Sequence, residues 1–249
     1  MKLTTIMAAA SMHQFHKEHP TFDYDRLFQV IDYFQPDYVG VEIRPEDIGA
    51  DDVYLGRNYP YEMIELSKRY GKGRRFGFDW LGEDIVGQSI PSNYWKEMCA
   101  YKRLERELLE DTGFKSDELD DLLEQQMDIV KSATPISLID GRYDTITKHY
   151  YQVVDDLLRG TKYELISKFR YNRDQEIGKN IVNFIYAHPG TRIALVMGAN
   201  HHVFILEALS NHFGSKHVIY EQPNSDKPKP KGFTTERQQV TQSDGRMVG

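Results

Sequence analysis

The sequence contains a single cysteine, Cys99, and this scarcity limits the chemistry that the chain can use. One thiol can form neither an intramolecular disulfide nor a cysteine-based zinc cluster, so the composition fits a reducing compartment. Cys99 lies among Trp95, Met98 and Tyr101 in a helical pattern, which favours a packed thiol over a nucleophile. The sequence also lacks a Gly-x-Ser-x-Gly motif, which makes covalent acyl catalysis the less favoured mechanism.

Clustered positive charge and long apolar runs are missing as well. The formal net charge is -7 and no run of Lys and Arg forms a basic stripe, which argues against a nucleic-acid partner. No stretch approaches membrane-spanning length. The apolar run at residues 3–10 is short for a secretory signal and predicts a first core strand instead. We therefore expect a cytoplasmic protein with no membrane span, and a homodimer is left open as its assembly.

What the sequence does contain is an alternation of strand-like and helical segments. The apolar runs predict strands at residues 3–10, 38–43, 75–79, 192–197 and 217–220. Helical spacing of apolar residues predicts helices at 22–34, 61–70, 94–109, 117–131, 145–159, 173–186 and 203–213. This order predicts an α/β fold with a mostly parallel central sheet flanked by helices. It also predicts a large helical insertion between the third and fourth core strands.

The same pattern divides the chain into parts. We expect a single α/β domain over residues 1–222, with a core at 1–90 and 170–222 and a cap-like helical insertion at 91–169. Such an insertion is either structural bulk or a cap that shapes substrate access. After residue 222 the sequence turns to Pro, Lys, Ser, Gln and Gly, which predicts a polar flexible tail at 223–249.

Polar side chains follow four of the predicted strands. Ligands bind beyond the carboxyl ends of the strands in open parallel sheets, so these side chains should converge on one rim. They are Ser11 and His13, then Glu42 and Arg44, then Asp79 and Trp80, and finally Asn200 with His201 and His202. A carboxylate that continues an apolar run, as Glu42 does, requires a cation, a hydrogen-bond network or a metal.

Some histidines are weaker candidates than others. His16 and His19 follow His13 at three-residue intervals, but Pro20 and the loop setting argue against a metal-binding helix, so both are expected to be solvated. Gly198 permits a close backbone approach to a ligand. Because His201 stands at a fixed spacing from Gly198, it is a better candidate site residue than the adjacent His202. No strand is followed by a Gly-x-Gly-x-x-Gly turn, so no nucleotide cofactor is expected.

Four motifs together resemble the TraB/GumN/TIKI family, in a superfamily with ChaN and the erythromycin esterases. Members show an early strand ending in Gly-x-x-His, a strand ending in Glu, an Arg-Asp or Arg-Asn pair opening a late helix, and a second Gly-x-x-His. The matching segments are Ala10-Ser11-Met12-His13, the strand that ends at Glu42, Arg173-Asp174, and Gly198-Ala199-Asn200-His201. The resemblance covers both ends of the α/β core, and Ala10 stands where the family usually has Gly.

The resemblance implies hydrolysis, or a metal-dependent peptidase activity as in the TIKI branch. In the metal-dependent version His13, Glu42 and His201 would hold one Mn, Co or Zn ion with an open position for water. Arg173 would neutralise oxyanion charge or steady Glu42, and Asp79 would orient a histidine. In a metal-free version, closer to the erythromycin esterases, Glu42 or a histidine would activate water as a general base.

These expectations define a candidate site and two non-catalytic alternatives. The catalytic set is His13, Glu42, Arg173 and His201, and the residues expected to contact a small-molecule or peptide substrate are Ser11, Asp79 and Asn200. The ChaN branch carries haem or iron, which the 16 Tyr and 9 His residues here could serve. A regulatory domain would instead bind a peptide or partner without turnover.

Overall fold

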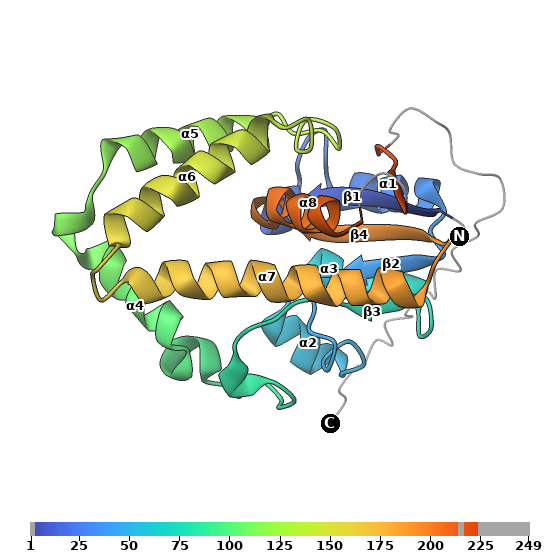
Figure 1. The fold of residues 1–249 in the computed structure, drawn as a ribbon, viewed down its shortest axis with the longest axis horizontal. Helices are drawn as coiled ribbons and strands as arrows, with labels where there is room; N and C mark the ends of the chain where they lie inside the picture. Colours follow the sequence, from blue (N-terminus) through green and yellow to red (C-terminus); the bar gives the residue numbers. More distant parts are fainter. Residues whose placement is uncertain (1–2, 214–216, 224–249) are drawn as a thin grey trace, which may run out of the picture.

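The computed structural model describes residues 3–213 and 217–223 of the chain. Within these residues one sheet has the strand order β3-β2-β4-β1-β5, and every pairing in it is parallel. The strands are β1 (Thr4–Ser11), β2 (Tyr38–Val41), β3 (Arg75–Gly77), β4 (Arg192–Gly198) and β5 (Val218–Tyr220). The predicted α/β fold with a parallel central sheet is therefore confirmed (Figure 1).

The register of the central strands determines which residues meet at the rim. β1 and β4 pair from Thr5 opposite Arg192 to Ser11 opposite Gly198, so the two strands end level with each other. β2 flanks β4 on its other side. Because all strands run in the same direction, the segments that follow them emerge at one edge of the sheet.

Helices cover both faces of the sheet, which explains why its strands are apolar on both sides. Met7 and Ala9 pack toward one face, against α1 (Tyr24–Phe34), α2 (Asp52–Asn58) and α3 (Tyr61–Tyr70). Ile6 and Ala8 pack toward the other face, against α7 (Glu164–Ala187) and α8 (Ala199–Phe213). Alternate residues of a strand point to opposite faces, so one strand serves both layers of the core.

The helical insertion lies between β3 and β4 in the chain, as predicted. Its elements are a π-helix (Tyr94–Met98), α4 (Ala100–Glu110), α5 (Asp117–Lys131) and α6 (Arg142–Leu158). Figure 1 shows these helices extending beyond the carboxyl ends of the strands, with α7 running from them back along the sheet. Three short 3-10 turns at His13–His16, Glu83–Ile85 and Thr112–Phe114 complete the described elements.

Several predicted boundaries are wrong. The helix predicted at 94–109 is interrupted at Cys99, whose backbone is extended between the π-helix and α4. The late helix begins at Glu164 rather than at Arg173, because its first half packs against α4 and α6 instead of the sheet. β2 and β3 are also shorter than predicted. The backbone that follows β2 passes directly over Gly77, so closely that a Cβ at Gly77 would lie 2.3 Å from the Ile43 carbonyl oxygen.

Two further expectations concern the ends of the chain and the membrane. The tail predicted at 223–249 lies outside the described residues apart from residue 223. In the described part of the chain, none of the helices combines the length and the apolar composition that crossing a bilayer requires.

Candidate functional site

Four of the predicted site residues meet at the carboxyl edge of the sheet. Glu42 is at the centre, and Arg173, His201 and His13 surround it. The exposed fraction of the side chain is 7% for Glu42, 14% for His201 and 39% for His13. The site is therefore buried at Glu42 and open to solvent at His13.

Both carboxylate oxygens of Glu42 are engaged. Oε1 accepts a hydrogen bond from Arg173 Nη2 at 2.7 Å, and His201 Nε2 lies 3.4 Å from the same oxygen. Oε2 accepts the backbone N–H of Gly198 at 2.7 Å. Gly198 directly precedes α8, so the carboxylate sits at the N-terminus of a helix, where negative charge is favoured.

Arg173 joins two buried carboxylates from neighbouring strands. Its Nε donates to Asp79 Oδ1 at 2.8 Å while its Nη2 holds Glu42. Asp79 follows β3 and also accepts its neighbour's backbone N–H, that of Trp80, at 2.7 Å. The guanidinium therefore bridges Glu42 and Asp79 and contacts Glu42 through a single nitrogen, Nη2.

His201 is held by a carboxylate that directly follows Arg173 in α7. Its Nδ1 lies 2.6 Å from Asp174 Oδ1, so Nε2 is directed toward Glu42. Burial alone would lower the pKa of His201, but the charge of Glu42 and the Asp174 contact outweigh burial and Arg173 and raise it to about 9. At neutral pH this imidazole carries a proton on both nitrogens.

His13 has a buried carboxylate partner of its own. Nδ1 lies 2.8 Å from Oε1 of Glu62, which is fully buried in the first turn of α3. Ser11 Oγ donates to the same Glu62 oxygen at 2.7 Å and accepts the backbone N–H of His13 at 3.0 Å. The backbone of His13 adopts a left-handed conformation with φ of 50°, which is uncommon outside glycine and typical of functional sites.

The absence of a side chain at Gly198 gives the His13 ring its space. A Cβ at Gly198 would lie 2.6 Å from His13 Nε2 and 3.3 Å from Glu42 Oε2. The space at Gly198 is therefore taken by the His13 ring, and the predicted close approach of a ligand to Gly198 stays a prediction. The same distances also show that Nε2, the nitrogen not bound to Glu62, faces the centre of the site.

The electrostatics separate the roles of the titratable groups. Burial would raise the pKa of Glu42, but His201, Arg173 and His13 outweigh it and hold this pKa well below its usual range. Burial raises the pKa of Asp79 despite Arg173. For His13, burial lowers the pKa, but the Glu62 hydrogen bond and the charge of Glu42 outweigh it, so the pKa is raised.

Other predicted residues lie elsewhere or act differently. Ser11 is 1% exposed and supports Glu62 and His13 from below the surface. Asn200 Oδ1 accepts the hydroxyl hydrogen of Tyr143 from α6, which ties the insertion to α8. His16, expected to be solvated, is fully buried, because Nε2 accepts the backbone N–H of Met12 and Nδ1 bonds the Phe22 carbonyl. That expectation was wrong.

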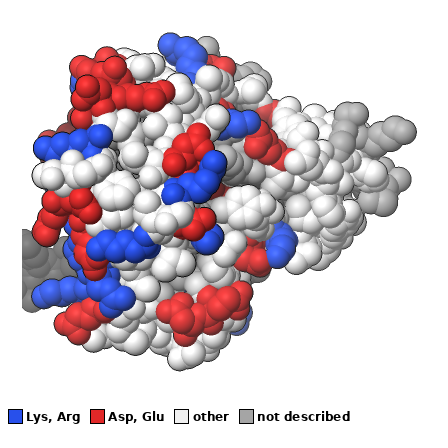
Figure 2. Space-filling model, turned by 60° about the vertical axis from the view of Figure 1, so that its left-hand side comes forward, with Lys and Arg blue, Asp and Glu red and all other residues white. Residues whose placement is uncertain are grey.

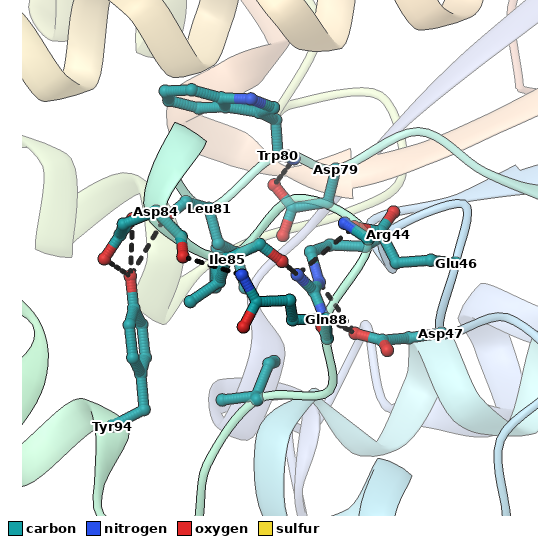
Figure 3. Close-up of polar contacts among 12 residues, drawn as sticks. Arg44, Glu46, Asp47, Asp79, Trp80, Leu81, Asp84, Ile85, Gln88 and Tyr94 are labelled. Atoms are coloured by element: carbon teal, nitrogen blue, oxygen red, sulfur yellow. Dashed lines mark hydrogen bonds and ion pairs between the residues drawn. The ribbon is translucent and has the colours of Figure 1, made fainter.

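Arg44 turns away from the site. Figure 3 shows it directed at Asp47 and at the loop that follows Asp79. Its Nε donates to Asp47 Oδ2 at 2.7 Å, and its terminal nitrogens donate to the carbonyls of Ile85 and Gln88 at 2.8 Å. Arg44 therefore fixes the loop that carries Trp80.

The side chains predicted to bind a divalent metal do not fit a ligand set. Among the described residues, no three His, Cys, Asp or Glu side chains are placed to hold a metal ion. Both oxygens of Glu42 are occupied, and the Arg173 guanidinium beside Oε1 would repel a divalent cation. The contacts that the structure describes thus do not form a ligand set, whereas the binding of Mn, Co or Zn itself stays a prediction.

Sequence reasoning gave no role to two residues, Glu62 and Asp174. Both continue an apolar helical stripe: Glu62 lies four residues before Leu66 in α3, and Asp174 lies three before Ile177 in α7. A carboxylate in such a stripe must be buried and must therefore find a partner. This pattern marks Glu62 and Asp174 in the sequence as carboxylates that need a buried partner, and the structure shows that the partners are His13 and His201.

The surface around the insertion carries charges of both signs. Figure 2 shows Lys and Arg interspersed with Asp and Glu over the face that includes the insertion. Ion pairs such as Lys148–Glu207 and Arg159–Asp156 account for part of this mixing.

Comparison of the chain with protein-family models, with curated proteins and with solved structures yields no match.

Proposed function

We propose that this protein is a hydrolase of esters or amides that activates water through His13 and stabilises the developing charge through His201. The observation that carries the proposal is the pair of histidines with separate carboxylate partners. Glu62 binds Nδ1 of His13 and Asp174 binds Nδ1 of His201, which leaves Nε2 of each ring facing Glu42 and Gly198. Two groups oriented in this way suit the acid and base roles of a hydrolytic reaction.

His13 is better suited than Glu42 to be the general base. A base works best with a pKa near the working pH, and the pKa of Glu42 is held far below it. Glu42 is also nearly inaccessible, whereas the His13 side chain is 39% exposed. Glu62 fixes the tautomer with the proton on Nδ1, so Nε2 can accept a proton from water.

The reaction then needs two proton transfers. As the water oxygen adds to the substrate carbonyl, one of its protons passes to His13 Nε2. When the tetrahedral intermediate collapses, the C–O or C–N bond breaks and the leaving group takes up a proton. His201, which is protonated below pH 9, can supply it or stabilise the oxyanion from Nε2. Arg173 fixes Glu42, and Glu42 in turn fixes His201.

The test is an activity screen with small esters, amides and short peptides. His13→Gln should lower kcat by about 10² to 10⁴ while the protein stays folded. His149→Gln, on the exposed face of α6, is the matched control and should leave the rate unchanged. Equal rates for His13→Gln and the wild type would contradict the proposal.

Two alternatives predict different outcomes in the same samples. In the metal-dependent version, chelation abolishes the activity and Mn, Co or Zn restores it. In the haem-binding version, the purified protein shifts the Soret band of added haem and hydrolyses nothing. The proposal expects turnover that survives chelation.

A further inference from the structure

Three aromatic rings stack directly beside the Arg173 ion pairs. Tyr101 from α4 lies 3.9 Å from Phe169 of α7 between ring centroids, with 13° between the planes. On the same Phe169 ring, Trp80 stacks with centroids 5.8 Å apart and planes at 29°. The stack thus joins the loop after β3, helix α4 of the insertion and helix α7, which carries Arg173.

Two of the stacked residues are close in sequence to residues of the candidate site, which places the stack beside that site. Phe169 lies four residues before Arg173, so both side chains share one face of α7. Trp80 directly follows Asp79, whose carboxylate accepts from Arg173. Tyr101 is electrostatically coupled to Arg173 and Asp79, and burial raises the pKa of its hydroxyl, which keeps it neutral.

Two of the three stacked rings lie outside the core, and the third, Tyr101, packs against its edge. Neither Trp80 nor Phe169 belongs to the two apolar clusters that form the core of the described residues. All three rings are only half-buried. Figure 3 shows the Trp80 ring projecting away from the Arg44 cluster. Half-buried aromatic rings beside polar side chains offer a face on which a flat apolar group can stack.

We infer that Trp80, Tyr101 and Phe169 form a subsite for a flat apolar group, so that the substrates are esters or amides carrying an aromatic ring beside the reacting carbonyl. This inference rests on the proposed hydrolytic function. The order of strands places Asp79 and Trp80 at the β3 side of the rim and His13 at the β1 side, with Glu42 and His201 between them. The ring of the substrate lies on the β3 side while water is activated on the β1 side.

The experiment compares substrates that differ only in the planarity of one ring. Methyl phenylacetate is paired with methyl cyclohexylacetate, and benzyl acetate with cyclohexylmethyl acetate. Aromatic stacking should make KM for the aromatic member of at least one pair roughly two- to tenfold lower, with similar kcat. Phe169→Leu should remove this preference, and Tyr101→Phe, which keeps the ring, should retain it. Equal KM values within both pairs, or a preference that survives both Phe169→Leu and Trp80→Leu, would overturn the inference.

A binding measurement separates this inference from the proposed function. The sequence has two Trp, so Trp95→Phe leaves Trp80 as the only tryptophan reporter. In that variant with His13→Gln added, methyl phenylacetate should change the Trp80 emission at lower concentration than methyl cyclohexylacetate. If the two titrations differ but the wild type shows no turnover, the hydrolase proposal is contradicted and the aromatic subsite is supported. If the wild type shows turnover but the titrations do not differ, the hydrolase proposal is supported and the aromatic subsite is contradicted.

Discussion

The imidazole Nδ1 of His13 lies 2.8 Å from Oε1 of Glu62, a carboxylate with no solvent exposure. The other oxygen of Glu62, Oε2, is buried without a hydrogen-bond partner among the described residues. A half-satisfied buried carboxylate costs stability, and such costs are characteristic of functional sites. We therefore expect the role of Glu62 to be the orientation of His13 and not the stabilisation of the fold.

The first prediction concerns Glu62→Gln, which keeps the shape of the side chain and removes its charge. Without that charge the pKa of His13 should fall, and the ring should lose its fixed tautomer. We expect kcat to drop about 10- to 100-fold, as is typical when an orienting carboxylate is lost. NMR titration of the His13 imidazole checks the cause. An unchanged pKa together with an unchanged rate would exclude Glu62 as the positioning residue.

The second prediction concerns the dependence of kcat/KM on pH. The base must be neutral, so the rate should rise as His13 loses its proton at a pKa above its ordinary 6.5. The acid must be protonated, so the rate should fall as His201 loses its proton near pH 9. The profile should be a bell with its maximum on the alkaline side of neutrality. In Asp174→Asn the alkaline limb should move to lower pH, because the contact that raises the pKa of His201 is weakened. A profile that stays flat from pH 6 to pH 10 would refute both assignments.

The third prediction concerns the bridge that Arg173 forms. Arg173→Met leaves Asp79 buried without its cation and leaves Glu42 with His201 as its remaining cationic partner, and breaking a buried pair in this way typically costs about 3–5 kcal/mol. Arg159→Met is the matched control, since its pair with Asp156 is exposed and should contribute at most about 1 kcal/mol. Urea denaturation of both variants measures the difference. Similar losses in the two variants would show that the bridge is not a determinant of stability.

The fourth prediction concerns Gly198→Ala. The added methyl would displace the His13 ring from Glu42, so activity should fall at least tenfold even where the fold persists, because small misplacements at a reacting centre are costly. Gly56→Ala, in α2 with open space around its Cα, should instead leave activity intact and raise stability by about 0.5–1 kcal/mol. Full activity in Gly198→Ala would mean that His13 has freedom to move.

The sequence sufficed for the fold because its signals were local and strong. The apolar run that became β4 and the helical spacing of α3 and α5 were read to within a residue of their observed bounds. The interruption at Cys99 and the early start of α7 depend instead on tertiary contacts. Cys99 is buried in the core, and the first half of α7 packs against α4 and α6. Periodicity along one segment does not contain that information.

The candidate site was predictable for a related reason. Parallel strands deliver their ends to one edge, so His13, Glu42 and His201 were expected to converge, and they do. Their partners were harder to assign. Asp79 was expected to orient a histidine, yet it binds Arg173, while Glu62 and Asp174 take that role from helices. Which carboxylate reaches which imidazole depends on helix packing, which strand order alone does not determine.

The continuity of α7 has a consequence for engineering this protein. One unbroken helix from Glu164 to Ala187 begins in the insertion, carries Arg173 and Asp174 midway, and ends on the sheet. A tilt of its first half, which packs against α4 and α6, therefore also moves the residues farther along the helix. A graft that changes the angle of the insertion would therefore also move Asp174 relative to His201. In the proposed hydrolase this would change the pKa of His201, so specificity and rate should change together.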